Sequence, residues 1–89
     1  MAKQIWKFPL PVADSFELTM PVGAVIIQVH EQKGEGMLWA VVDTDPEVAE
    51  VVRKFRVFGT GHDLPDLIYI GTWQMAGGTF IWHLFEEEG

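Results

Sequence analysis

Turn-forming residues interrupt this chain at short and fairly regular intervals. Gly, Pro and Asp recur about every eight to twelve residues, and the segments between them are rich in aromatic and β-branched side chains. This spacing suits strands and leaves little room for helices. In Ser15–Met20, for example, apolar and polar residues alternate as in a strand with one buried face. The sequence therefore predicts an all-β fold, with a single domain over residues 1–89.

The segments with strand character are Gln4–Phe8, Ser15–Met20, Ala24–Gln32, Met37–Val42, Val51–Phe58, Tyr69–Met75 and Thr79–Phe85. Lys33–Gly36 and Ala76–Gly78 contain the glycines that supply the positive φ of tight hairpins. Asp45, Pro46 and Glu47 give the one helix-start signal, with room for a single turn. We expect a small β-sandwich or partly open barrel of about seven mostly antiparallel strands.

Two of the predicted strands are apolar on both faces. Met37–Val42 is apolar throughout, and Phe80–Phe85 is apolar except for His83. A chain of 89 residues has little interior with which to cover both faces of these strands. We therefore expect a homo-oligomer, in which another copy hides the remaining apolar face or an edge strand.

Composition narrows the range of partners. Thirteen Asp and Glu against six Lys and Arg give a formal charge of −7, which disfavours nucleic acid because phosphate binding needs cations. The absence of Cys suits a reducing cytoplasm. The longest apolar stretch, Leu18–Ile27, is short and is interrupted by Pro21 and Gly23. With no apolar signal segment evident, we expect a cytoplasmic protein that binds neither membrane nor nucleic acid.

No catalytic or metal-binding signature stands out. The single Ser, Ser15, is not in a strand–elbow–helix context. His30, His62 and His83 have neither metal-site spacing nor an accompanying carboxylate cluster. We therefore expect no enzyme activity and no cofactor, and an acid–base role for His62 is the weakest alternative.

The loop Gly59–His62 is the strongest candidate binding site. It lacks the full glycine pattern of a dinucleotide site, the Lys of a phosphate-binding loop, and a following helix. Its amides could form an anion-binding nest, or the loop could be only a tight corner in which His62 satisfies backbone groups. Guanidinium groups nearby would bind phosphate, and a Trp would stack on a planar ring. The predicted ligand-binding residues are Arg53, Arg56, Gly59, Thr60, Gly61, His62, Trp73 and Trp6.

Taken as a set, several motifs resemble a family of small uncharacterised phage proteins. The motifs are Ile5-Trp-Lys-Phe-Pro9, Trp39-Ala40, Phe55-Arg56, Gly59-Thr-Gly-His62, Tyr69-Ile-Gly-Thr-Trp-Gln74 and His83-Leu-Phe-Glu86. The resemblance brings no assigned activity with it. It implies a viral origin and action in the host bacterial cytoplasm, where small phage proteins commonly block a host protein or sequester a defence signal.

Two functions remain as expectations. The first is sequestration, by an oligomer, of a small anionic ligand such as a signalling nucleotide, in the manner of a counter-defence protein. This function requires the Gly59–His62 loop, an Arg and a Trp to converge. The alternative is inhibition of a host protein through an apolar or acidic surface, which requires only that such a surface be exposed.

Overall fold

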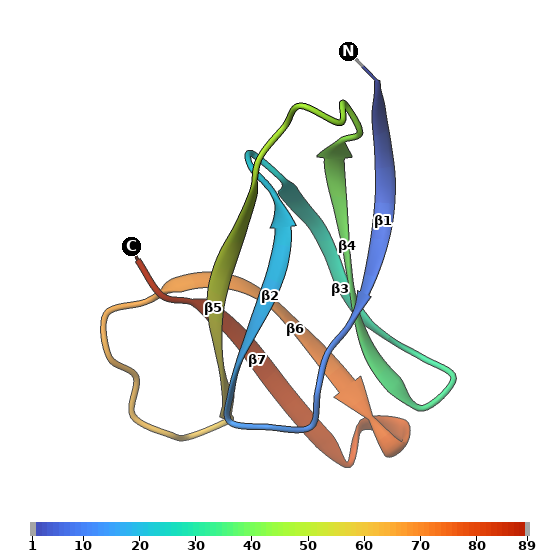
Figure 1. The fold of residues 1–89 in the computed structure, drawn as a ribbon. Coiled ribbons are helices and arrows are strands. Elements are labelled where there is room, and N and C mark those ends of the chain that lie inside the picture. The colour runs from blue at the N-terminus through green and yellow to red at the C-terminus, as the bar shows by residue number, and fades with distance from the viewer. Residues whose placement is uncertain (1, 89) are drawn as a thin grey trace.

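A computed structural model, which describes residues 2–88, shows two antiparallel sheets packed face to face (Figure 1). The strands are β1 (Lys3–Pro9), β2 (Ser15–Pro21), β3 (Val25–Gln32), β4 (Glu35–Asp43), β5 (Glu50–Gly59), β6 (Ile68–Met75) and β7 (Phe80–Glu86). One sheet has the strand order β1-β4-β3, and the other has the order β2-β5-β7-β6. The predicted all-β fold is confirmed as a two-sheet sandwich that does not close into a barrel.

The connections follow the predicted turn chemistry. The helix-start signal produces a single turn, in which Glu47 N–H donates to Asp45 Oδ1 at 2.9 Å and Val48 N–H donates to the Asp45 carbonyl at 3.0 Å. Ala76–Gly78 forms the short 3₁₀ turn η1 between β6 and β7, with Gly77 at φ +66°. The left-handed conformation explains why glycine stands at this turn.

Alternation along β4 decides which side chains form the core. Leu38, Ala40 and Val42 are almost completely buried, whereas Trp39 and its neighbours on the opposite face are only half-buried. Phe55 of β5 lies in the core on the facing sheet. Full burial of a large apolar side chain such as that of Leu38, Val42 or Phe55 contributes about 1.5–3 kcal/mol.

Two glycines allow the sheets to approach each other closely. A Cβ atom on Gly71 of β6 would lie 3.0 Å from the Cβ of Val29 on β3. A Cβ atom on Gly36 of β4 would lie 2.8 Å from the indole Nε1 of Trp73 on β6. The missing side chains therefore place β6 against the β3–β4 hairpin and fix the position of Trp73.

Candidate functional site

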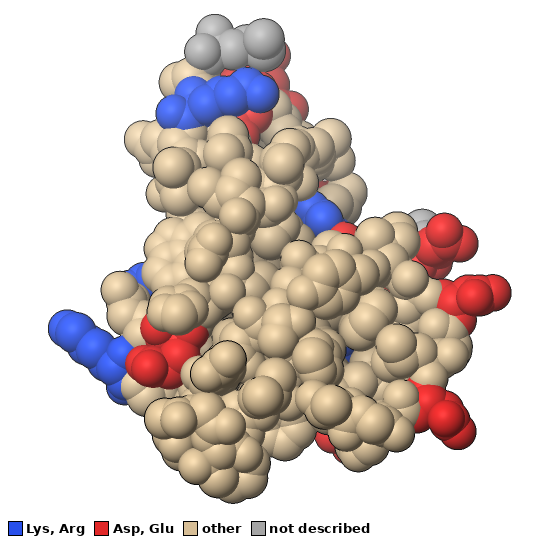
Figure 2. Space-filling view, turned by 180° about the vertical axis from the view of Figure 1, so that it is seen from behind, with Lys and Arg blue, Asp and Glu red and all other residues tan. Residues whose placement is uncertain are grey.

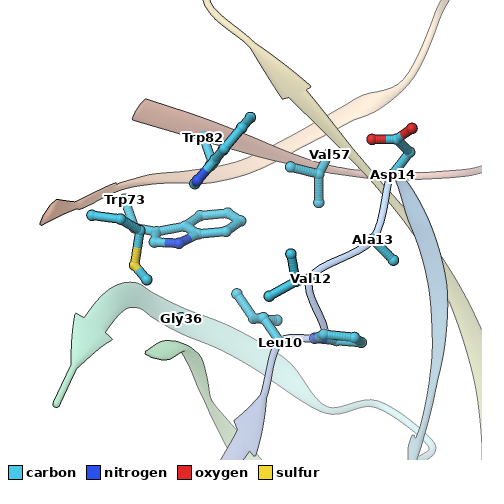
Figure 3. A pocket seen from close by; sticks show the side chains of 10 residues that line it. Leu10, Val12, Ala13, Asp14, Gly36, Val57, Trp73 and Trp82 are labelled. Carbon is cyan, nitrogen blue, oxygen red and sulfur yellow. The ribbon is translucent and has the colours of Figure 1, made fainter. Parts of the chain in front are cut away.

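A pocket of about 170 Å³ lies at the end of the sandwich, where residues 10–14 cross from one sheet to the other (Figure 3). We call it the tryptophan pocket. Its lining residues are Leu10, Pro11, Val12, Ala13, Asp14, Gly36, Val57, Trp73, Met75 and Trp82. Asp14 is the only charged residue of this lining, and its carboxylate stands at the rim in Figure 3. The pocket is therefore apolar, with a single negative charge at its edge.

Two indoles on neighbouring strands build one wall of the tryptophan pocket. Trp73 and Trp82 are directly opposite each other in the register of β6 and β7. Trp73 is buried and Trp82 is half-buried, and the ring of Phe80 stacks on Trp82 with 6.0 Å between centroids. Within residues 2–88, no atom accepts a hydrogen bond from either of these two indole N–H groups. The wall therefore offers a ligand aromatic surface.

The opposite wall is held in place by main-chain hydrogen bonds to both sheets. Leu10 N–H donates to the Gly36 carbonyl at 2.9 Å, and Val57 N–H donates to the Asp14 carbonyl at 2.9 Å. These two bonds anchor both ends of the crossing segment, and Val12 between them is fully exposed. The pocket is thus preformed by the fold, as small-ligand and side-chain pockets usually are.

The Gly59–His62 loop has the geometry of a tight corner. His62 N–H donates to the Gly59 carbonyl at 3.4 Å, and Gly59 N–H donates to His62 Nδ1 at 3.3 Å. Gly61 has φ +91°, and His62 is exposed. The Gly59 amide, one of those expected to face an anion, is thus directed at the His62 ring.

A chain of polar contacts ties this corner to the sheet. Thr60 Oγ1 lies 2.9 Å from His83 Nε2, and Thr72 Oγ1 lies 2.9 Å from His83 Nδ1. The Tyr69 hydroxyl continues the chain to Thr72 at 2.7 Å. Among residues 2–88, no group of three His, Asp or Glu side chains could hold a metal ion. The contacts of His83 instead join β6, β7 and the corner.

The Arg53 guanidinium forms hydrogen bonds to other groups of the protein. Its Nε and Nη2 donate to the two carboxylate oxygens of Glu86 at 2.6 and 2.7 Å, and its Nη1 donates to the Ala24 carbonyl at 2.8 Å. Hydrogen bonding to Glu86 raises the pKa of Arg53, although partial burial acts in the opposite direction. The guanidinium therefore joins β5 to β7 and to the turn before β3.

Arg56 and Trp6 lie away from this ion pair. Arg56 is on the other face of β5, with its Cζ 5.1 Å from the ring centroid of Phe58. Trp6 belongs to the other sheet, is 39% exposed, and donates its indole N–H to Gln4 Oε1 at 2.9 Å.

The structure brings some of the predicted site residues together and separates others. Gly59 is paired with Trp82, and Trp82 is paired with Trp73, so the three lie in one row across β5, β7 and β6. Neighbouring strands are about 4.8 Å apart, which puts Gly59 roughly 10 Å from Trp73. Arg53, Arg56 and Trp6 do not join this row, because they occupy other register positions or the other sheet.

A second hollow, wider and open, surrounds the Arg53–Glu86 ion pair and has a volume of about 770 Å³. Its lining residues are Gly23, Ala24, Val51, Val52, Arg53, Lys54, Ile68, Glu86, Glu87 and Glu88. Three carboxylates thus outnumber two cations, and one of those cations is already paired. This charge balance does not favour an anionic ligand.

Sequence reasoning missed Trp82, Met75, Val57 and Leu10 as pocket residues. A signal for Trp82 was available, because Trp73 and Trp82 stand at similar distances on either side of the Ala76–Gly78 turn. A hairpin with this turn places them opposite each other on one face. Leu10 and Val57 gave no such signal, because they reach the pocket from other parts of the fold.

The fold and this site define a small all-β domain with an apolar, tryptophan-lined pocket. The chain belongs to the family described as Domain of unknown function (DUF7352), whose model matches residues 1–89. No curated protein and no solved structure matches the chain. The family match agrees with the expected membership of an uncharacterised family. No helix in the described part of the chain is long and apolar enough to cross a membrane.

Proposed function

We propose that this chain is a non-enzymatic binding protein whose tryptophan pocket takes one large apolar side chain of a protein partner. The size and lining of the pocket carry the proposal. Its volume of about 170 Å³ is below the roughly 300–1,000 Å³ of pockets that enclose drug-sized ligands. A single large side chain matches a space of this size more closely than a nucleotide does.

Surfaces around the pocket support a protein partner. Phe80, which stacks on Trp82, is 52% exposed, and Val12 at the mouth is fully exposed. Elsewhere on the molecule, the side shown in Figure 2 is also covered mostly by uncharged residues. An aromatic pocket surrounded by exposed apolar side chains is the usual anatomy of a binding hot spot.

The proposal also covers the kind of partner and the cellular location of the protein. Following the resemblance to small phage proteins, we take the partner to be a host protein and the location to be the bacterial cytoplasm. Binding would block that partner, in the manner of a counter-defence protein. This mode of action requires a surface and needs no catalytic group.

Selection from a random displayed-peptide library, followed by calorimetry, tests the proposed function. We expect the selected peptides to share one large apolar residue. Burial of such a residue contributes about 1.5–3 kcal/mol, so Trp82→Ala should weaken binding by about ten- to a hundredfold. Trp39→Ala is the matched control, because Trp39 is a half-buried indole on the outer face of the other sheet.

Two results would contradict the proposed function. One is a library that yields no specific binder. The other is a set of binders whose affinity is the same for the wild type and Trp82→Ala while Trp39→Ala weakens them. The second result would place the binding surface on the three-stranded sheet.

Sequestration of a small anionic ligand is the second candidate, and one observation favours it. Among the described residues, Arg56 forms no salt bridge, and its guanidinium lies over the ring of Phe58. Thermal shift against a panel of linear and cyclic nucleotides tests this candidate, with Arg56→Ala and His62→Ala beside the wild type. Stabilisation that disappears in Arg56→Ala supports it, and no stabilisation by any nucleotide rejects it.

A further inference from the structure

Strand β1 has a free edge and exposes apolar side chains on both of its faces. Among the strands, only β4 approaches it within 8 Å between Cα atoms. Ile5 is 61% exposed on one face of the strand, and Trp6 is 39% exposed on the other. Phe8 near the end of β1 packs against the core, whereas the indole of Trp6 on the inner side stays partly exposed. Exposure of both faces and an edge is unfavourable for a strand in a monomer.

The free edge of β1 can be identified from its hydrogen bonds. At the two ends of the β1–β4 ladder, Thr44 N–H donates to the Ala2 carbonyl and Leu10 N–H donates to the Gly36 carbonyl, both at 2.9 Å. In an antiparallel pair the bonded residues alternate, so the even-numbered residues of β1 bond to β4. The residues whose main-chain groups turn away from β4 are Lys3, Ile5 and Lys7.

Strand β2 is an edge strand of the other sheet and has a free side of the same kind. Val22 N–H donates to the Ala49 carbonyl at 2.8 Å, and Val57 N–H donates to the Asp14 carbonyl at 2.9 Å. The even-numbered residues of β2 therefore bond to β5. The residues whose main-chain groups turn outward are Ser15, Glu17 and Thr19.

We propose that two copies of this chain form a dimer in which β1 of each copy pairs with β2 of the other. β1 and β2 run in opposite directions and are joined directly by residues 10–14, so the two edge strands of each copy come together at this crossing (Figure 1). Rotation about a twofold axis parallel to the strands leaves the direction of every strand unchanged. β1 of one copy is therefore antiparallel to β2 of the other, as it is to β2 of its own copy. Each three-stranded sheet then continues into the four-stranded sheet of the second copy.

Charge complementarity favours β2 over β1 as the occupant of the β1 edge. If β1 paired with itself about Ile5, Lys3 and Lys7 of the two copies would face each other, and like charges repel. Glu17 stands at the centre of the outward residues of β2. Lys7 and Glu17 are equally far along the chain from Val12, so the pairing brings them opposite or diagonal to each other. The same arrangement turns the inner side of Trp6 towards the second copy.

Sedimentation analysis of the wild type and of Ile5→Pro tests the dimer. We expect a wild-type dimer at micromolar concentration and a monomer for Ile5→Pro, because proline removes only an N–H that β4 does not use. Ile5→Thr is the matched control, since it keeps the N–H and should stay dimeric. Far-ultraviolet circular dichroism of Ile5→Pro should match that of the wild type.

Charge reversal provides a second test that does not depend on proline. Lys7→Glu and Glu17→Lys should each raise the dimer dissociation constant about tenfold, and the double variant should restore it. Trp82→Ala should leave the dimer intact, so the test is separate from that of the tryptophan pocket. A monomeric wild type would overturn the proposal. A folded Ile5→Pro dimer, or a double variant weaker than both single variants, would overturn it as well.

Discussion

Arg53 and Glu86 form a two-point ion pair that joins β5 to β7 at the end of their pairing, where Phe55 is opposite Glu86. Their side chains are 21% and 14% exposed, so both charges are largely shielded from water. A shielded charge that loses its partner is costly, because its desolvation is no longer offset. The pair therefore stabilises this end of the four-stranded sheet only while both members are present.

Removal of one member of this pair should lower stability markedly. For Glu86→Gln we expect a loss of about 1.5–3 kcal/mol, the usual contribution of a hydrogen bond to a charged group. Urea denaturation of Glu86→Gln and of the double variant Arg53→Met/Glu86→Leu measures this effect. The double variant should be the more stable of the two, because it leaves no unpaired charge. Equal stability of Glu86→Gln and the wild type would mean that the pair contributes nothing.

Two glycine substitutions should differ in their effect on stability. In Gly36→Ala the new Cβ would meet buried Trp73 at 2.8 Å, so we expect a loss of about 1–3 kcal/mol. In Gly59→Ala it would meet the exposed ring of His62 at 3.2 Å, and that ring can move aside. Gly59→Ala should therefore stay within about 0.5 kcal/mol of the wild type. Thermal denaturation of both variants checks the contrast, and the reverse order would contradict the close contact at Trp73.

The polar chain around His83 should contribute modestly to stability. Thr72→Val removes the hydroxyl that contacts both His83 and Tyr69, so we expect a loss of about 0.5–1.5 kcal/mol for each of the two contacts. Imidazole nitrogen chemical shifts of His83 should change as well. A variant without a change in either stability or His83 shifts would show that these contacts are absent in solution.

The two faces of β4 should respond differently to truncation. Leu38 is completely buried, so Leu38→Ala should cost about 2–5 kcal/mol. Trp39 faces outward and is half-buried, so Trp39→Ala should cost less despite the larger change in volume. Denaturant unfolding of both variants compares them. A larger cost at Trp39 would mean that the outer face is covered in the native assembly.

The sequence predicted most of the fold because the local signals agree with one another. The alternation in Ser15–Met20 and the glycines of Ala76–Gly78 each indicated an element that the structure contains. The predicted strand limits differ from the observed ones by one or two residues. β4, for example, begins at Glu35 rather than Met37. Residues next to a turn pair with the opposite strand without a strong sequence preference, which explains this difference.

The site was less predictable, because it depends on contacts between residues distant in sequence. Arg53 had the residue type and neighbours expected of an anion ligand, yet its partner is Glu86, 33 residues away. That pairing follows from the order β5-β7-β6, which no local pattern determines. Trp73 was predicted to stack on a ligand beside the Gly59–His62 loop, and in the structure it lines the tryptophan pocket next to Trp82.

The most direct test of the proposed function follows the indole N–H resonances of the four Trp residues by nuclear magnetic resonance during titration with a selected peptide. We predict that the Trp73 and Trp82 resonances shift and saturate together, because both indoles belong to the tryptophan pocket. Trp39, on the outer face of the other sheet, should remain unchanged. A peptide that binds while shifting only Trp39 or Trp6 would contradict the claim that the tryptophan pocket receives the partner's side chain.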